Sequence, residues 1–287
     1  MTLLETHQVP SLKTPIRLQE YGVGIFKAIP TKSGLKKAIK KGLIRVNKTT
    51  ATTALFINGN ERIELYNSPK NTSRKPFNFP LRILFEDAYL AIIYKPPGIL
   101  VSGNSFATID NALLQNLKKS TLSDVVRPRP VHRLDYPTSG LLLVGKTSTS
   151  ITALNQLFEH KQIQKTYHAV ALGKMEQYGT INFPINNKKA LTHYKVLQTV
   201  SSNRFKFLNL VELSPQTGRK HQLRKHLLAI NSPILGDKDY YISNLILKGK
   251  GLYLHASSLS FIHPFTEKHM TITKELPKKF LAIFSTL

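Results

Sequence analysis

The second half of the chain is dominated by extended runs of residues that do not alternate regularly with helices. Such runs lie at 166–172, 193–200, 205–213 and 252–261, and two shorter strands are expected at 82–85 and 89–94. Regular alternation of strands and helices would indicate a parallel sheet, and its absence favours a mixed one. We therefore expect an α+β domain with a central mixed, mostly antiparallel sheet flanked by helices.

Helices are expected where apolar residues recur at helical spacing between capping residues. The candidates in the second half of the chain are 109–119, 148–160, 218–230 and 277–284. Near the N-terminus, a helix at 33–42 combines an apolar stripe of Leu35, Ala38 and Ile39 with four lysines that lie mainly off that stripe. These lysines are Lys36, Lys37, Lys40 and Lys41.

The N-terminal region is expected to form a small domain of its own. After the lysine helix, strands are expected at 43–46 and 63–66, so that residues 19–67 form an α/β-hairpin module. Such a module suits RNA, although a lysine-rich face is also typical of a solvated surface helix. Residues 1–18 show no clear periodicity and are expected to form an arm. Residues 68–80 are rich in Pro, Asn, Ser and Lys and predict a linker before a domain at 81–287.

Composition limits the function classes. The formal charge of +25 attracts polyanions and indicates a nucleic-acid partner, although a generally basic protein from an AT-rich genome would also carry many lysines. The chain has no cysteine, which excludes disulfides, thiolate nucleophiles and cysteine-containing zinc sites. No apolar run approaches a membrane span and no signal peptide is evident, so we expect a cytoplasmic protein that does not bind membranes.

The segment His132-Arg133-Leu134-Asp135-Tyr136-Pro137-Thr138-Ser139-Gly140 places a carboxylate beside a cation on a turn, ahead of the apolar run 141–144. A neighbouring guanidinium favours the ionised carboxylate, so Asp135 is a candidate for chemistry. Asp in such a turn also has a purely structural explanation, because its side chain can bond nearby backbone N–H groups. A kinase catalytic loop is excluded, because Leu134 separates the Arg from the Asp.

A second cluster, 217–227, gathers basic side chains near the start of the helix expected at 218–230. His221 and Arg224 are three residues apart, which predicts that they share a helix face. Such donors suit phosphate or carboxylate groups, and a solvated basic helix is the alternative. His221 and His226 point to different faces, so a metal site is not expected.

Taken together and in order, several segments resemble the RluA-type pseudouridine synthases, which isomerise uridine in structured RNA. The resemblance covers about residues 80–285, and residues 20–67 more loosely resemble the alpha-L RNA-binding module. The matching segments are Lys95-Pro96-Pro97-Gly98, His132–Gly140, Lys165-x-Tyr167-x-Ala169, Gly218–His226, Pro233–Asp237, Leu252–Ala256 and His263-Pro264.

The resemblance implies a role for each matching residue. Asp135 would be the nucleophile, Tyr167 would contact the target base and help remove the C5 proton, and Arg224 would pair with Asp135. Leu254 would line the uracil pocket, and Arg133 would help fill the space that the extruded nucleotide leaves. Further expected substrate contacts are His132, Arg219, His221 and Gln222, with Lys220 and Lys225 as phosphate contacts; the module would bind RNA through Lys36, Lys37, Lys40, Lys41 and Arg45.

The implied function is isomerisation of specific uridines in large-subunit ribosomal RNA. Transfer RNA is the alternative substrate, and a non-catalytic RNA-binding or ribosome-assembly factor is the alternative function. The isomerisation oxidises nothing and releases no group, so neither a metal nor a cofactor is expected. We also expect the protein to be a monomer.

Overall fold

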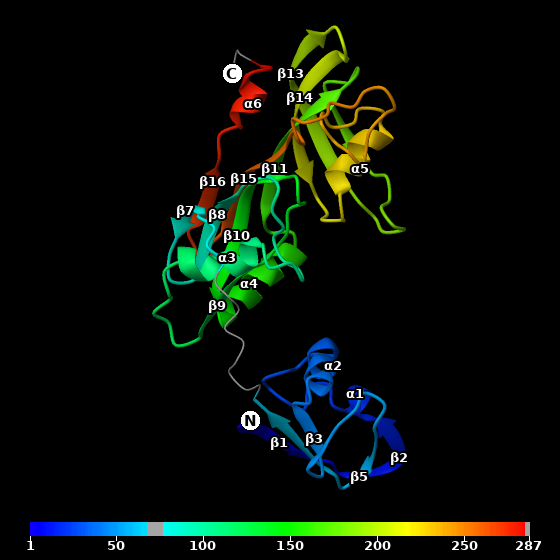
Figure 1. The fold of residues 1–287 in the computed structure, drawn as a ribbon, viewed down its shortest axis with the longest axis vertical. Coiled ribbons are helices and arrows are strands. Elements are labelled where there is room, and N and C mark those ends of the chain that lie inside the picture. Colours follow the sequence, from blue (N-terminus) through cyan, green and yellow to red (C-terminus); the bar gives the residue numbers. More distant parts are fainter. Residues whose placement is uncertain (68–76, 285–287) are drawn as a thin grey trace. The chain divides into compact units, whose positions relative to one another are not determined.

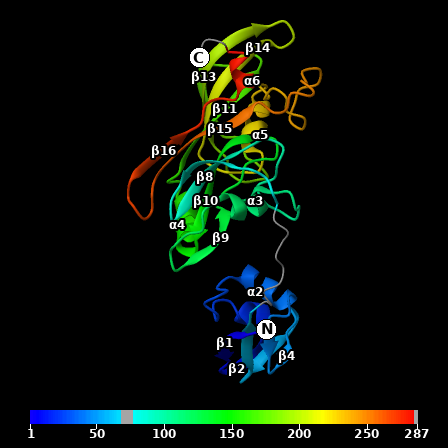
Figure 2. The same ribbon diagram turned by 60° about the vertical axis from the view of Figure 1, so that its left-hand side comes forward.

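The computed structural model describes residues 1–67 and 77–284. The chain divides into two compact units, Met1–Arg74 and Lys75–Leu287. Figure 1 shows both units with most of their helices and strands labelled, and Figure 2 shows them from a second direction.

The first unit combines two small sheets with two helices (Figure 1). One sheet has the strand order β1-β6-β3-β4, and β2 pairs with β5 in the other. The strands are β1 (Leu3–Gln8), β2 (Ser11–Arg17), β3 (Ile44–Val46), β4 (Thr49–Thr50), β5 (Phe56–Gly59) and β6 (Arg62–Tyr66). The helices are α1 (Leu18–Tyr21) and α2 (Lys32–Lys40).

The lysine-rich helix forms as predicted and begins slightly earlier. The Thr31 side chain accepts the Gly34 N–H and caps α2, and Gly42 follows the helix in the left-handed region, at φ 66°. The stripe of Leu35, Ala38 and Ile39 is buried in the core of this unit. The lysines therefore remain on the opposite, solvent-facing side of the helix.

The expectation that residues 1–18 form an arm is wrong. They form β1 and β2, which pair antiparallel with β6 and β5 respectively. Both partner strands lie about forty residues or more further along the chain, and Val9 between β1 and β2 is buried in the core. The segment carries no strong local pattern because its exposed edge residues need not be apolar, and its structure comes from pairing with distant strands.

The second unit is built on a ten-stranded sheet with the order β12-β13-β14-β11-β15-β10-β8-β7, with β16 paired to β15 and β9 to β10. Only β10 and β15 pair in parallel; the other pairs of this sheet are antiparallel. The fold class is thus the mixed, mostly antiparallel α+β arrangement that the sequence predicts. The strands are β7 (Arg82–Glu86), β8 (Leu90–Lys95), β9 (Val125–Pro130), β10 (Ser139–Thr147), β11 (Gln164–Leu172), β12 (Tyr178–Ile181), β13 (Thr192–Ser202), β14 (Lys206–Pro215), β15 (Leu254–Ile262) and β16 (His269–Thr273).

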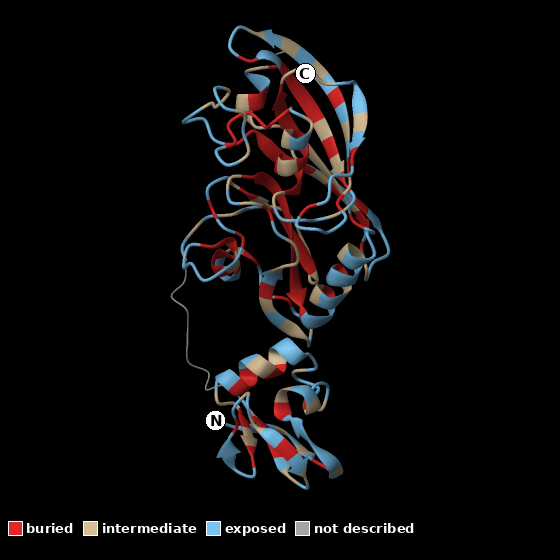
Figure 3. Cartoon of the chain, turned by 90° about the vertical axis from the view of Figure 1, so that its right-hand side faces the viewer, coloured by how far each residue is buried: buried red, intermediate tan, exposed pale blue. Residues whose placement is uncertain are grey.

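Strand β10 is buried along its whole length, because helices cover both faces of the sheet around it. Leu142 and Val144 belong to a core that includes α3 (Ile109–Asn116). Leu141 and Leu143 belong to another core that includes α4 (Ser148–Glu159). Figure 3 shows the buried residues concentrated in these central strands. The short apolar run at 141–144 therefore lies in a central strand of the sheet.

The expected helix at 218–230 starts later than predicted. Helix α5 runs from Gln222 to Ala229, and His221 ahead of it adopts a left-handed backbone with φ 57°. The preceding residues form a turn, in which the Gln222 side chain accepts hydrogen bonds from the Thr217 hydroxyl and the Arg219 N–H. The last helix, α6, is also short (Lys278–Leu281).

The predicted linker falls largely on residues 68–76, which lie outside the described residues. Its last part belongs to the second unit, because Phe77 and Phe79 stack on each other and pack against the core that contains α3. Among the helices of residues 1–67 and 77–284, none combines the length and apolar character needed to cross a lipid bilayer.

Candidate active site

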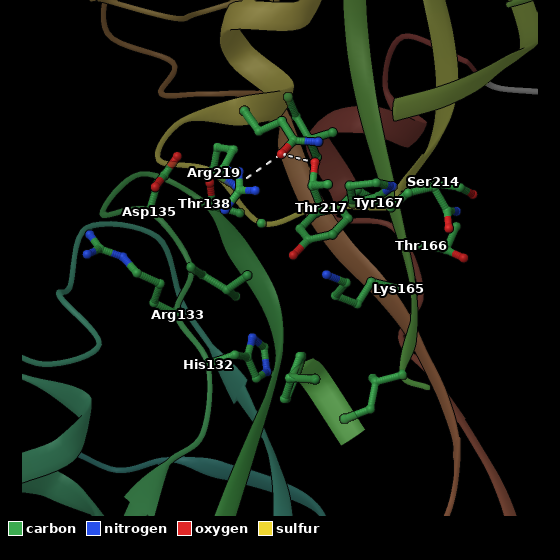
Figure 4. Close-up of a pocket in the computed structure, with 18 of the residues that line it drawn as sticks. His132, Arg133, Asp135, Thr138, Lys165, Thr166, Tyr167, Ser214, Thr217 and Arg219 are labelled. Atoms are coloured by element: carbon green, nitrogen blue, oxygen red, sulfur yellow. Dashed lines mark hydrogen bonds between the residues drawn. The ribbon is translucent and has the colours of Figure 1, made fainter. Parts of the chain in front are cut away.

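An open cavity of about 910 Å³ lies in the second unit, where β10, β11 and β15 approach the loop before α5. It is lined by residues 131–135 from the loop before β10, by 163–167 at the start of β11, by 214–223 before and at the start of α5, and by Leu254 of β15. Four separate parts of the sequence therefore meet at one site (Figure 4).

Asp135 lies on the turn that leads into β10, and its side chain is 17 % exposed. Lys95, at the end of β8, is hydrogen-bonded to this turn. Its buried ammonium donates to the carbonyl oxygens of Tyr136 and Thr138 at 3.2 and 2.6 Å, and to that of Pro96 at 3.0 Å. Burial lowers the pKa of Lys95 to about 8, although the nearby Asp135 carboxylate raises it. The carboxylate is thus carried on a turn that is anchored to the sheet.

Arg224 faces Asp135 but is held by other carboxylates. The Arg224 Nη1 lies 4.0 Å from Asp135 Oδ2, whereas its Nε and Nη2 donate to the two oxygens of Asp237 at 2.6 Å each. Asp239 accepts a further bond at 2.8 Å. Burial alone would lower the pKa of Arg224, but the bonds to Asp237 and Asp239 raise it above its ordinary value. The guanidinium is therefore a fixed positive charge beside Asp135.

Tyr167 and Lys165 extend from the same face of β11 into the cavity, two residues apart (Figure 4). Burial, and then the charge of Asp135, raise the pKa of Tyr167 well above its usual range. The phenol is therefore protonated at neutral pH. Burial lowers the pKa of Lys165, and its ammonium lies 5.8 Å from the centre of the Phe158 ring.

His132 and Gln222, which the sequence predicted as substrate contacts, form hydrogen bonds within the protein. His132 accepts the Leu143 N–H at 2.9 Å through Nε2, and burial lowers its pKa to about 3, so that it stays neutral. Gln222 uses both ends of its amide, since its nitrogen also donates to the Leu191 carbonyl and to Thr192 Oγ1. These side chains shape the walls of the cavity.

The other predicted residues of the site also line the cavity. They are the apolar Leu254, the basic residues Arg133, Arg219 and Lys220, and His221. Arg219 is exposed and donates to the Lys189 carbonyl. Lysine and arginine outnumber acids on the lining, where Asp135 and Glu159 are the acidic residues. A polyanion therefore suits this opening.

In the first unit, the predicted basic residues fall into two kinds. Lys37, Lys40 and Lys41 are exposed, and Lys36 is partly so. Arg45 instead packs its guanidinium over the Tyr66 ring, 4.7 Å from its centre. The helix lysines are free to meet an anion, whereas Arg45 is part of the unit's own packing.

Sequence reasoning assigned no role to four residues that the structure places at or around the site. Three of them, Lys95, Lys165 and Asp237, lie in the segments that carry the family resemblance. Nothing else in the sequence indicated that they belong to the site. Tyr240, whose hydroxyl meets the His221 ring, had no signal, because the contact joins a loop to a helix end.

Comparison with known proteins identifies the family. The family model described as RNA pseudouridylate synthase matches residues 89–229. The protein named ribosomal large subunit pseudouridine synthase D from Buchnera aphidicola subsp. Schizaphis graminum is 35% identical, with 86% of this chain and 87% of that protein covered. The chain belongs to the RNA pseudouridine synthase family. It is accordingly an isomerase that acts on RNA.

Other relatives of this pseudouridine synthase agree with that assignment. The protein of the same name from Nitrosomonas europaea is 32% identical, with 90% of this chain and 80% of that protein covered. Among solved structures, human RNA pseudouridylate synthase domain containing 4 superposes with a TM-score of 0.59 at 26% identity, covering 71% of this chain and 92% of that one. The chain thus shares the pseudouridine synthase fold.

Proposed function

We propose that this synthase isomerises uridine in large-subunit ribosomal RNA, with Asp135 as the nucleophile. The observation that carries the assignment of Asp135 is its position: a carboxylate in a basic cavity, 4.0 Å from a buried guanidinium and on the same cavity as a protonated phenol. The ribosomal substrate is supported by the names of the relatives, ribosomal large subunit pseudouridine synthase D.

The reaction requires three changes at the target uridine. The bond between C1′ and N1 breaks, the base turns, and C5 bonds to C1′. The C5 proton is then lost and N1 gains a proton, so that atoms balance without a co-reactant. Asp135 can attack the sugar covalently or stabilise a glycal or oxocarbenium-like species, as carboxylates do in glycosidic cleavage. Both routes use the Asp135 carboxylate, which lies 4.0 Å from the Arg224 guanidinium.

Tyr167 and Leu254 hold the base in this proposal. A stacked uridine cannot reach the cavity, so the nucleotide must be flipped out at a cost of a few kcal/mol. Arg133 enters the vacated space, and Arg219, Lys220 and Lys225 contact phosphates, which offsets that cost. Because these contacts release counterions, binding weakens steeply with salt. Because the Tyr167 phenol is protonated, it can pass on the C5 proton only by giving its own hydroxyl proton to solvent at the same time.

The first unit adds RNA affinity in this proposal, through Lys36, Lys37, Lys40 and Lys41. Deleting residues 1–67 is expected to weaken RNA binding more than it slows the chemical step. The triple variant Lys37→Ala, Lys40→Ala and Lys41→Ala is expected to reproduce part of that loss, since these side chains are exposed. Undiminished affinity in both variants would exclude the first unit from substrate binding.

The deciding experiment maps pseudouridine in total RNA from cells with and without the gene, rescued by wild type or by Asp135→Ala. We expect a defined site in large-subunit ribosomal RNA to be lost and to return only with wild type. If the lost site lies in transfer RNA, the substrate is transfer RNA and the ribosomal assignment is wrong. Unchanged maps would favour the non-catalytic role, and rescue by Asp135→Ala would refute the nucleophile. The proposed enzyme is a cytoplasmic monomer, which fractionation and light scattering test.

A further inference from the structure

His221 lies between Tyr240 and Asp135, at the left-handed residue that precedes α5. Its Nδ1 is 2.9 Å from the Tyr240 hydroxyl, and its Nε2 is 3.8 Å from Asp135 Oδ1. The two nitrogens thus face two different groups, one a phenol and the other the carboxylate of the cavity. At 3.8 Å the second pair is beyond hydrogen-bond distance. A hydrogen bond between Nε2 and Oδ1 requires the two side chains to move closer, as catalytic groups do when a substrate binds.

The Tyr240 hydroxyl is held in place by the network around Asp237. Asp237 Oδ1 accepts the backbone N–H groups of Asp239 and Tyr240 at 2.9 and 3.0 Å, which shapes the loop. The Arg224 guanidinium, bound to the same carboxylate, lies 4.8 Å from the centre of the Tyr240 ring. The ring is therefore fixed on one side by Arg224 and directs its hydroxyl at His221.

This arrangement selects one tautomer of a neutral His221. If Tyr240 donates to Nδ1, the proton of the ring sits on Nε2 and points at Asp135. If Nδ1 instead donates to Tyr240, an Nε2 lone pair faces the carboxylate, which is repulsive. The first tautomer therefore has the lower energy.

The protonation state of His221 follows from its surroundings. The charged groups near it are Asp135, Asp239, Arg224 and Lys220. Burial lowers its pKa, Asp135 raises it, and Arg224 and Lys220 lower it again, with a net fall below the ordinary value. The ring is thus neutral at neutral pH, which makes the choice of tautomer decisive.

We propose that His221 is a positioning residue for Asp135, and that Tyr240, by donating to Nδ1, stabilises the tautomer in which the His221 Nε2–H is donated to Oδ1. This inference rests on the proposed role of Asp135 as the nucleophile. Arg224 Nη1 lies 4.0 Å from Oδ2 and His221 Nε2 lies 3.8 Å from Oδ1, so the two carboxylate oxygens face different nitrogens. The imidazole orients the carboxylate without adding a second permanent positive charge beside it.

The first test changes only the phenol oxygen. Tyr240→Phe keeps the ring over Arg224 and removes the hydroxyl that donates to His221 Nδ1 in the proposed tautomer. We expect kcat to fall about 5- to 10-fold, the effect of one lost hydrogen bond, with KM unchanged within about twofold. Turnover is measured as tritium release from RNA labelled at uridine C5. Tyr241→Phe, at the exposed neighbouring tyrosine, is the matched control and is expected to behave as wild type.

The second test separates hydrogen bonding from backbone shape. His221→Gln places an N–H donor near the position of Nε2, whereas His221→Asn does not reach it. Asn tolerates the left-handed backbone at this residue better than Gln does. A positioning role predicts that Gln stays within about fivefold of wild-type kcat while Asn loses about 50-fold. A merely structural role predicts the reverse order.

Asp135→Asn, measured in parallel, distinguishes failure of this inference from failure of the proposed function. If Asp135→Asn retains turnover, the nucleophile assignment itself is wrong. If Asp135→Asn is inactive and Tyr240→Phe matches wild type, the tautomer inference is overturned alone. A rise in KM with unchanged kcat in the His221 variants would assign His221 to substrate binding and also overturn it.

Discussion

The buried ammonium of Lys95 donates a hydrogen bond to the carbonyl oxygen of Thr138, 2.6 Å away, at the end of the turn that carries Asp135. The same group also donates to the carbonyl oxygens of Pro96 and Tyr136. Lys95 pairs with Gly140 in the sheet. The end of β8 is thereby tied both to the turn and to the start of β10.

Lys95→Met is expected to release this turn. Methionine fills a similar volume but removes the donor from the buried Thr138 contact and from the part-buried Pro96 and Tyr136 contacts. The Tyr136 carbonyl keeps the Gly98 N–H, so we expect a cost of about 1–3 kcal/mol in the free energy of unfolding. Because Asp135 is then less well oriented, we expect kcat to fall at least about 100-fold. Urea unfolding and tritium release measure the two effects. A stable variant with wild-type turnover would show that the turn keeps its shape without Lys95.

Asp237→Asn is expected to destabilise the second unit, because it leaves the buried Arg224 guanidinium without a full counter-charge. Losing one partner of a buried pair costs about 3–5 kcal/mol. Asp239→Asn is the matched control: its side chain is 64 % exposed, so the loss is expected to stay below about 1 kcal/mol. Urea unfolding of both variants tests the contrast, and equal losses would contradict it.

Gly140→Ala is expected to disrupt the parallel pairing of β10 with β15. A Cβ at this position would meet the Ala256 carbonyl oxygen at 2.2 Å, and Gly140 has φ 125°. We expect at least about 3 kcal/mol of destabilisation, since neither backbone can give way easily. A Cβ at Gly218 meets nothing within 4 Å, so Gly218→Ala is expected to unfold at the same urea concentration as wild type. Wild-type stability in Gly140→Ala would mean that the two strands can separate.

The stability of the second unit is expected to fall in mild acid because of His255. Burial, with further contributions from His168 and Lys274, lowers the pKa of His255 from 6.5 to about 4. Above about pH 6.5 the ring is neutral in both states and the stability is complete. As the pH falls below 6.5, His255 becomes protonated in the unfolded chain while it stays neutral in the folded protein. The free energy of unfolding therefore decreases until about pH 4, where the folded protein is protonated as well.

His255→Gln removes this contribution. Between pH 7.5 and pH 5, wild type is expected to lose about 2 kcal/mol more unfolding free energy than the variant does. Urea titrations at the two pH values provide the comparison. Parallel losses in the two proteins would place the acid sensitivity elsewhere, for example at His132.

Local sequence patterns predicted the elements whose residues carry their own periodicity. The stripe of Leu35, Ala38 and Ile39 predicted α2, and the apolar run at 141–144 predicted a strand within β10. They did not predict the strands at 3–8 and 11–17, which have weak patterns and depend on distant partners. The start of α5 was also misplaced, because Gln222 bonds to the preceding turn and that turn displaces the helix.

The sequence by itself determined the family and the mixed sheet, and it proposed Asp135, Tyr167 and Arg224 as candidate residues of the site, because ordered motifs and strand-length runs are local properties of the chain. Only the tertiary structure decided how these groups are held. In the structure, Lys95 donates a hydrogen bond to the turn that carries Asp135. Arg224 donates to Asp237, and the Tyr240 hydroxyl is hydrogen-bonded to His221. Such contacts join atoms from separate segments, and their distances depend on packing and strand register, which no local pattern records.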